Sequence, residues 1–207
     1  MREMVAKAMV EKYKLSFTTG GLLRNETLMV AKLFLLSCDW SIVQQRVMVE
    51  NYIQLKALSS RRRILREIRM RLEKLSVAEM QILVSGPHRD VDAILWLAIC
   101  RSYVFIGDFA KEVLHEKKLS LQRKIEFVDF NLFVEQKSVI HPELLGLRDS
   151  TTKRLRQALF SIMRNCGLID QDGNIQTMLL SSKVLKVLKN NFSEGLYFPI
   201  HPGDHEK

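Results

Sequence analysis

Apolar residues recur at helical spacing along most of this chain, and polar capping residues separate the repeats. The clearest stripe lies in residues 59–75, where the apolar side chains fall on one side of a helix with about 3.6 residues per turn: Ile64, Leu65, Ile68, Leu72 and Leu75. A stripe of this width packs against a neighbouring element. The pattern therefore predicts a mainly α protein, organised as a helical bundle.

The same periodicity predicts helices over residues 1–12, 22–36, 91–101, 106–117, 127–137, 142–147 and 182–190. Other helices begin at capping residues: Asp39 caps one that runs to about residue 58, and Ser150 caps one that runs to residue 166. Ser76 and Glu79 spell the capping box Ser-x-x-Glu at the start of a short helix that ends at Ser85. Residues 91–101 are almost wholly apolar, so we expect them to form the central helix of the core.

A turn signal follows the helix that ends at residue 166. The pair Asp172-Gly173 lies between the short segments 168–170 and 174–176, and Asp-Gly is a strong signal for a tight hairpin. A helix, a tight hairpin and a basic helix in this order resemble a winged helix-turn-helix, in which a recognition helix enters the major groove of DNA. We therefore expect winged helix-turn-helix-like parts and one short β-hairpin near the C-terminus.

The best candidate for a boundary between two halves is Ser85-Gly86-Pro87, because Gly and Pro interrupt helices. It predicts an N-terminal helical domain over residues 1–85, which carries an arginine-rich helix. The C-terminal helical domain covers residues 86–207 and ends in the winged-helix-like unit. A second glycine pair, Gly20-Gly21, is expected to form the turn that enters the helix at residue 22.

The composition indicates a folded protein with an anionic partner. Of the 207 residues 47% are hydrophobic, and 32 Lys and Arg against 23 Asp and Glu give a net charge of +9 and a pI near 9.6. Such an excess favours nucleic acid or an anionic membrane surface. The longest apolar run covers only residues 93–100, whereas a spanning helix needs about 20 residues, so we expect no membrane insertion. The N-terminus lacks the apolar core of a signal peptide, which predicts a cytoplasmic location.

The sequence carries no signature of catalysis or of a bound cofactor. Cys38, Cys100 and Cys166 lie far apart in apolar or helical surroundings, which predicts buried free thiols. No pair of Cys or His residues has zinc-ligand spacing, and no phosphate loop, dinucleotide fingerprint or Gly-x-Ser-x-Gly motif occurs. We therefore expect a protein that is not an enzyme and that needs no metal or cofactor.

The first candidate surface is the outer side of the helix over residues 59–75. This stretch holds seven Lys and Arg against two acids, and Arg62, Arg66 and Arg69 stack one turn apart, opposite the apolar stripe. Guanidinium groups pair with phosphate oxygens and keep their charge at any working pH. The ridge can therefore follow a nucleic-acid backbone. The alternative is a solvated helix face, to which Glu67 and Glu73 contribute.

The second candidate surface lies on the helix over residues 150–166. Lys153, Gln157 and Arg164 share one exposed strip, flanked by Arg154, Arg156 and Phe160. Gln pairs with adenine and Arg or Lys with guanine, so the strip could read base edges, and non-specific phosphate contact is the simpler alternative. Phe160 is expected to pack against another helix rather than to stack on a base, and Trp40 is likewise expected to be packed.

The opposite charge prevails between residues 126 and 150, where five acids face one Lys and one Arg. We expect this segment to face away from nucleic acid. The predicted DNA-binding residues therefore lie on three other helices: Arg61, Arg62, Arg63, Arg66, Arg69, Lys153, Arg154, Gln157, Arg164, Lys183 and Lys186.

The order of the motifs resembles the BrxA family of BREX phage-defence systems over nearly the whole chain. The resemblance rests on four blocks in order: KLSFTTGGLL at residues 14–23, Ser59-Ser60 followed by Arg62 and Arg66-Glu67-Ile68, LWLAICR at 95–101 with Tyr103 and Phe105, and His141-Pro142-Glu143-Leu144 followed by Thr151, residues 153–157 and Leu159-Phe160. The resemblance implies a helical DNA-binding accessory factor with winged-helix-like parts. The methyltransferase and the ATPase of such systems are the partners that it implies besides double-stranded DNA.

The residues and the resemblance together predict a non-enzymatic protein that binds duplex DNA through backbone contacts and takes part in a BREX-type assembly. One alternative is a protein-interaction adaptor whose positive charge serves an acidic partner subunit. A second alternative is an RNA-binding protein.

Overall fold

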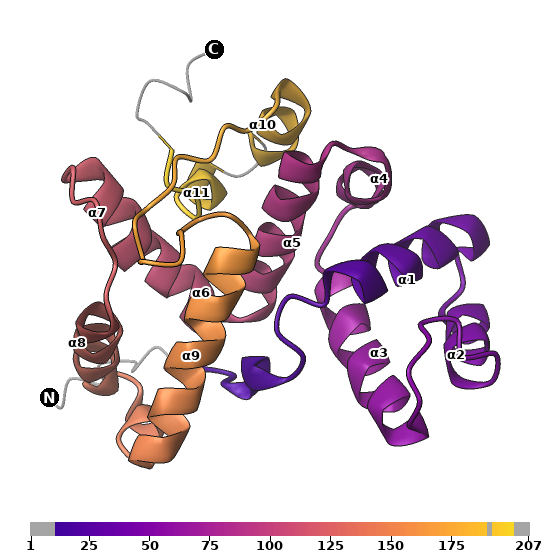
Figure 1. The fold of residues 1–207 in the computed structure, drawn as a ribbon, viewed down its shortest axis with the longest axis horizontal. Helices are drawn as coiled ribbons and strands as arrows, with labels where there is room; N and C mark the ends of the chain where they lie inside the picture. Colours follow the sequence, from indigo (N-terminus) through magenta and orange to yellow (C-terminus); the bar gives the residue numbers. More distant parts are fainter. Residues whose placement is uncertain (1–10, 190–191, 201–207) are drawn as a thin grey trace, which may run out of the picture.

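A computed structural model describes residues 11–189 and 192–200 and confirms that the chain is mainly helical (Figure 1). In chain order its elements are η1 (Ser16–Thr18), α1 (Arg24–Ser37), α2 (Trp40–Met48), α3 (Leu58–Leu72), α4 (Val77–Ser85), α5 (His88–Ser102), α6 (Val104–Phe109), the π-helical η2 (Ala110–His115), α7 (Glu116–Leu119), α8 (Phe127–Ser138), η3 (Pro142–Leu144), α9 (Asp149–Asn165), α10 (Ser182–Leu188) and α11 (Phe192–Gly195). The helix expected over residues 1–12 lies outside the described part, except for Glu11 and Lys12, which are not helical.

Helix α5 is the central element, as its apolar sequence predicts. Every residue from Ala93 to Cys100 is buried, and α3, α4, α6 and α10 all pack against the helix (Figure 1). A helix that is apolar on all sides is stable in water only when neighbours cover it completely. Among the described residues, no single helix is long and apolar enough to cross a membrane, although α5 and the helix that follows it pass that test as a pair bent by 118°.

Aromatic rings fill the space between α6, α8 and the segment before α1. Phe105 of α6 contacts Phe130 and Phe133 of α8 with ring centroids 5.8 and 5.3 Å apart. Phe17 of η1 is fully buried and stacks on Phe105, although the two residues are far apart in the sequence. Each such ring buries a large apolar area, so these contacts hold the N-terminal segment against the C-terminal half.

The helix starts that depend on side-chain caps are partly as predicted. Ser76 and Glu79 form the predicted capping box, and the Asp39 carboxylate accepts a hydrogen bond from the Ser41 backbone N–H at 2.7 Å. Ser150 does not cap its helix, because α9 already begins at Asp149. Helix α2 ends ten residues earlier than expected, at Met48. The loop that follows needs positive φ angles at Asn51 and Gln54, which no helix accommodates.

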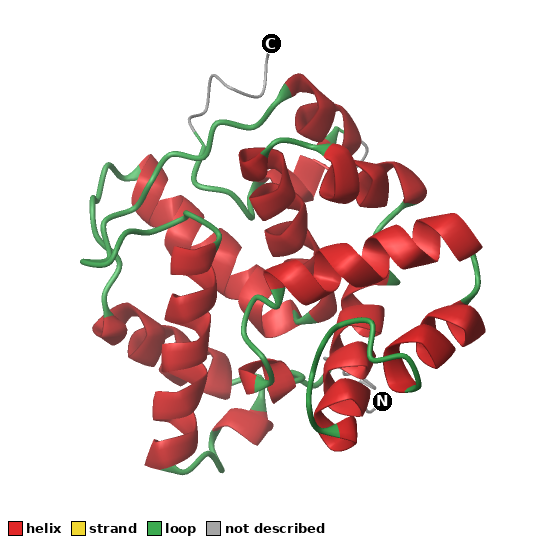
Figure 2. Cartoon of the chain, turned by 45° about the vertical axis from the view of Figure 1, so that its right-hand side comes forward, coloured by secondary structure: helices red, strands yellow, loops and turns green. Residues whose placement is uncertain are grey.

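The predicted β-hairpin and winged helix-turn-helix parts are not supported, because no strand occurs in the part of the chain that the structure describes (Figure 2). The Asp172-Gly173 turn forms, but it is flanked by isolated bridges alone, Ile169–Ile175 and Lys124–Asn174. The carboxylate of Asp170 accepts the backbone N–H groups of Asp172 and Asn174. This side chain therefore supports the turn, while backbone bonds from Asp170 to Asn174 and from Gln176 to Leu168 still join the two segments.

Two buried charge networks connect the halves on either side of Gly86. Arg71 of α3 pairs with Glu67 at 2.8 Å, and the hydroxyl of Tyr103 donates to the same carboxylate at 2.7 Å. Arg101 of α5 pairs with both Glu79 of α4 and Glu194 of α11. One continuous core of buried apolar residues also spans both halves. The division at residue 86 into two domains stays a prediction.

Candidate nucleic-acid interface

Helix α3 has the two faces that the sequence predicts. Ile64, Leu65, Ile68 and Leu72 are buried against the rest of the protein, and four arginines are exposed: Arg62, Arg63, Arg66 and Arg69. We call Arg62, Arg66 and Arg69 the arginine ridge. The burial of the apolar stripe fixes the rotation of α3 about its axis, and that rotation turns the ridge toward solvent.

The arginine ridge forms one wall of a groove between α2 and α3. The groove has a volume of about 360 Å³ and is lined by Trp40, Gln44, Met48, Arg62, Leu65, Arg66 and Arg69. We call it the α2–α3 groove. Its floor is apolar and its rim carries three cations and the Gln44 amide. A rim of this kind provides donors for phosphate oxygens without a carboxylate among the lining residues.

One arginine of the ridge is held in place by two contacts within the protein. The guanidinium carbon of Arg69 lies 5.0 Å from the centre of the Trp40 ring, and Arg69 Nε donates to Glu73 Oε1 at 2.7 Å. Trp40 in turn stacks on Phe34, with ring centroids 4.4 Å apart. A stacked guanidinium loses less rotamer entropy when it binds a ligand than a freely moving one.

The fifth predicted arginine of this helix has a different position. Arg61 is half-buried, and its Nη1 donates to the backbone oxygen of Met48 at 2.7 Å. It therefore joins the end of α2 to the start of α3 and does not line the groove. Conversely, Trp40 and Gln44 line the groove although the sequence pattern predicted no binding role for either. Their only signal was the position of both on one helix next to the arginine-rich one.

The strip on α9 divides into an exposed and a half-buried part. Lys153, Arg154 and Gln157 are exposed, as predicted. Arg164 is half-buried, with its guanidinium 6.0 Å from the Phe160 ring. Phe160 is buried, as expected, and its ring contacts that of Phe127.

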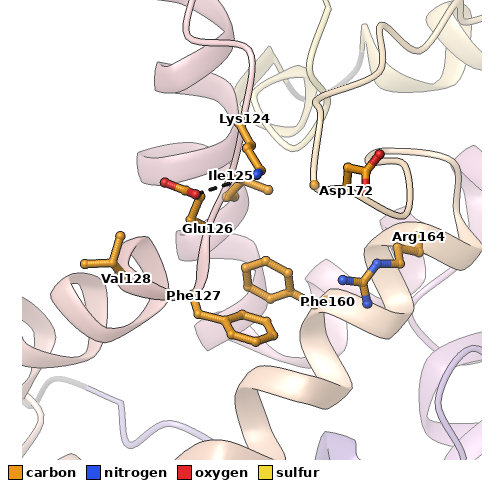
Figure 3. A pocket seen from close by; sticks show the side chains of 9 residues that line it. Lys124, Ile125, Glu126, Phe127, Val128, Phe160, Arg164 and Asp172 are labelled. Carbon is orange, nitrogen blue, oxygen red and sulfur yellow. Dashed lines mark ion pairs between the residues drawn. The ribbon is translucent and has the colours of Figure 1, made fainter.

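Arg164 faces a shallow pocket of about 420 Å³ between α8, α9 and the Asp172-Gly173 turn (Figure 3). The rings of Phe127 and Phe160 form its wall, and an ion pair between Lys124 and Glu126 lies beside them. Asp172 also lines this pocket. The two carboxylates make it a poor site for a phosphate backbone.

The remaining predicted residues lie on α10. Lys183 and Lys186 are exposed and line a hollow of about 570 Å³ between α10 and the end of α4. Helices α3 and α9 lie on either side of the segment that contains η1 (Figures 1 and 2). Helix α10 lies beside the end of α5 that is farther from η1 (Figure 1). The fold thus joins Arg62, Arg66 and Arg69 in one groove. It places the α9 strip and the two lysines elsewhere on the surface.

A metal site is not apparent in the described residues, where no group of three or more His, Cys, Asp or Glu side chains is placed to hold an ion.

Cys38 is exposed, contrary to expectation, whereas Cys100 and Cys166 are buried. All three are free thiols.

Comparison with known proteins identifies similarity to the BrxA family. The sequence profile of BrxA matches residues 11–191. Over 172 residues the chain is 24% identical to the BREX protein BrxA of Escherichia coli O9:H4 (strain HS). The matched region covers 82% of this chain and 81% of that protein. Over 165 residues it is 25% identical to the BREX protein BrxA of Bacillus cereus (strain H3081.97), covering 78% and 82%.

A solved structure has the same fold. The crystal structure of an uncharacterized protein from Magnetospirillum magneticum superposes with a TM-score of 0.79, at 22% sequence identity, and the match covers 92% of this chain and 99% of that one. The family profile extends over both halves of the chain, from the segment before η1 to the end of α10. The chain therefore belongs to the BrxA family of BREX phage-defence proteins.

Proposed function

We propose that this protein is a non-enzymatic component of a BREX phage-defence system that binds double-stranded DNA through phosphate contacts of the arginine ridge. The observation that carries the proposal is the α2–α3 groove, in which Arg62, Arg66 and Arg69 meet without a carboxylate among the lining residues. The names of the two BrxA relatives support the assignment to phage defence. The net charge of +9 supports a polyanionic partner.

The dimensions of the ridge fit a phosphate backbone. Arg62 and Arg69 are seven residues apart, which corresponds to about 10 Å along a helix axis. Phosphates along one strand of duplex DNA rise by about 3.4 Å each along the DNA axis. A ridge of this length is comparable to the axial rise of about three phosphates, so its arginines can contact neighbouring phosphates.

The surroundings of Trp40 favour a duplex over a single strand. Proteins that hold single strands commonly stack exposed aromatic rings on successive bases. Here the ring of Trp40 stacks on Phe34 and carries the guanidinium of Arg69, so it is engaged within the protein. The groove then offers charge and hydrogen-bond donors for phosphates, and these contacts suit the continuous backbone of a duplex.

The exposed strip on α9 is the candidate for any sequence preference. Lys153 and Gln157 are both exposed on α9, one turn apart. If this strip reads bases, Gln157→Ala changes the ratio of affinities between DNA sequences more than the mean affinity. An equal loss on all sequences assigns the strip to phosphate contact.

The test of the proposal is the salt dependence of binding to a duplex of mixed sequence. The triple variant Arg62→Gln, Arg66→Gln, Arg69→Gln keeps helix propensity and leaves the buried stripe of α3 intact. The matched control removes three exposed arginines that lie outside the groove, by Arg89→Gln, Arg123→Gln and Arg148→Gln. Both variants lose the same net charge, so a difference between them reports position rather than total charge.

We expect the slope of log affinity against log salt to fall by about one unit for each ridge arginine, and by much less in the control. An unchanged slope in a folded ridge variant would contradict the proposal and would favour the protein-interaction adaptor. Tighter binding to a matched RNA duplex or single strand, lost in the ridge variant, would favour the RNA-binding alternative.

A further inference from the structure

One arginine of α3 bonds to the end of the neighbouring helix instead of facing solvent. Arg61 is half-buried, and its Nη1 atom donates to the backbone oxygen of Met48, the last residue of α2, at 2.7 Å. Its Nε atom is buried and makes no hydrogen bond within the described residues. Arg62 and Arg63, the next two residues of the helix, are exposed. The Arg61 guanidinium therefore belongs to the contact between α2 and α3.

The bond lies where a cation helps α2 more than α3. The last carbonyls of a helix have no partner within the helix, and this end carries a partial negative charge, so the Arg61 cation at the Met48 carbonyl is stabilising. Arg61 itself lies near the start of α3, where a cation is mildly unfavourable, and no acid in the first turn of α3 offsets it. The position of Arg61 therefore benefits α2 rather than its own helix.

A second arginine of α3 holds the other end of α2. Arg69 lies over the ring of Trp40, the first residue of α2. Arg61 and Arg69 are eight residues apart on α3. Trp40 and Met48 are likewise eight residues apart on α2, and this separation corresponds to about 12 Å along a helix axis. The two helices therefore run antiparallel with matched spacing, and an arginine of α3 contacts each end of α2.

The α2–α3 groove lies between these two contacts. Residues of both helices line it: Trp40, Gln44 and Met48 from α2, and Arg62, Leu65, Arg66 and Arg69 from α3. Val43 and Val47 of α2 are fully buried, so apolar packing keeps the helix docked on its inner side. The bond from Arg61 therefore acts on the position of the end of α2, beside Arg62, more than on whether the helix docks.

We propose that Arg61 is a positioning residue of the α2–α3 groove, which holds the C-terminal end of α2 against α3 before DNA binds and does not contact DNA itself. This role rests on the proposed function, because it concerns the same groove. A binding site that is formed in only a fraction of the molecules loses affinity in proportion to that fraction. Loss of the Arg61 bond should therefore weaken binding without removing a phosphate contact.

Arg61→Met tests this role, because it removes the cation and the donor and keeps an unbranched side chain. We expect duplex affinity to fall by about fivefold, as for a groove formed in about one molecule in five, while the slope of log affinity against log salt changes by much less than one unit. Arg62→Met, which removes a ridge arginine, should lower the slope by about one unit. Arg89→Met, at an exposed position outside the groove, is the control for lost charge and should leave affinity and slope close to those of the wild-type protein.

Arg61→Lys is the conservative variant. Among the described residues a single guanidinium nitrogen of Arg61 is bonded, to Met48, so a lysine ammonium can replace it. We expect Arg61→Lys to recover most of the affinity, whereas lysine cannot replace an arginine that pairs with a phosphate through two nitrogens. An Arg61→Lys variant as weak as Arg61→Met would contradict the positioning role.

Amide hydrogen exchange of the full-length protein, followed by two-dimensional NMR, reports on the end of α2 directly. The amide of Val49 donates to the Gln45 oxygen at 2.8 Å and should exchange faster in Arg61→Met. Saturating duplex DNA should slow this exchange again to the wild-type rate, because DNA binding and formation of the groove are coupled reciprocally. A bond that serves stability alone gives no such coupling.

Three further results would overturn the proposal. The first is a slope lowered by a full unit in Arg61→Met, which would make Arg61 a phosphate contact. The second is unchanged affinity and unchanged exchange at Val49 in this variant. The third is faster exchange at Val49 that duplex DNA leaves unaltered. Failure of the proposed function is distinct, because it shows as an unchanged slope in the triple variant of the arginine ridge.

Discussion

Arg69 lies over the ring of Trp40, with the guanidinium carbon 5.0 Å from the ring centre. The contact joins the exposed side of α3 to the first residue of α2. Together with the bond from Arg69 Nε to Glu73, it leaves the two terminal nitrogens of Arg69 for a ligand in the α2–α3 groove. The groove is thus formed by the packing of two helices, and one of its cations is held in place before a ligand arrives.

Replacing Trp40 by Leu should weaken duplex binding without changing the number of phosphates contacted. A cation–π contact near the protein surface gains about 0.5–1 kcal/mol, so we expect a loss of about twofold to fivefold in affinity. Trp40→Phe, which keeps an aromatic ring over Phe34, should recover most of the loss. Gel-shift titrations at several salt concentrations give affinity and slope together. A slope reduced by a full unit would mean that Arg69 no longer reaches the DNA at all.

The buried pair of Arg71 and Glu67 makes a strong prediction about stability. Their side chains are only 2% and 8% exposed, so Arg71→Met leaves a carboxylate buried without its cation. We expect a loss of about 3–5 kcal/mol in the free energy of unfolding, measured by urea titration at neutral pH. The exposed neighbour Arg66→Met should change it by less than about 0.5 kcal/mol.

The double variant Glu67→Gln, Arg71→Met tests whether the charge causes this loss. Removal of the carboxylate charge should restore part of the stability, because no unpaired ion remains in the core. If the double variant were as unstable as Arg71→Met alone, lost packing and the bond to the backbone oxygen of Leu22 would explain the effect instead.

The pH dependence of stability should follow Glu79. Burial by itself raises the pKa of this carboxyl, but hydrogen bonds from Arg101 and from the backbone of Ser76 outweigh burial and hold the pKa below its ordinary value of 4.5. A group with a lowered pKa in the folded state contributes stability above its unfolded pKa and loses it as the pH falls through the folded value. We therefore expect the melting temperature to fall below about pH 4.5.

Glu79→Gln isolates this contribution. At neutral pH the variant should be less stable by about 2 kcal/mol, since a hydrogen bond to a charged group is lost while Arg101 keeps Glu194. Between pH 6 and 3 its melting temperature should fall less steeply than that of the wild-type protein. Parallel curves for the two proteins would assign the acid sensitivity to other carboxylates.

The three cysteines should react at very different rates. Cys38 is exposed, whereas burial raises the pKa of the Cys100 and Cys166 thiols, so their reactive thiolates are scarce. With Ellman's reagent the native protein should release one equivalent rapidly, and denatured protein should release three, one for each cysteine of the chain. Rapid release of two or more equivalents from native protein would indicate that the core around α5 opens readily.

Much of the secondary structure follows from short-range patterns. The capping box of Ser76 and Glu79 and the apolar stripe of α3 are local features, and the structure has both. Exposure of Arg62, Arg66 and Arg69 also follows, since the apolar stripe determines which side of α3 is covered. The Asp172-Gly173 turn also forms, supported by the side chain of Asp170, but the segments that flank it do not extend into strands.

The sequence by itself determined where most helices lie and which face of each is apolar, because helical periodicity is written in residues three and four positions apart. Only the tertiary structure decided what covers each face. It brought Trp40 to Arg69 and thereby made the groove, and it buried Glu67 with Arg71 and Tyr103 although the pattern placed that glutamate among solvated residues. Contacts between residues 29 or 36 positions apart have no local signature, since they arise from the packing of whole helices around α5.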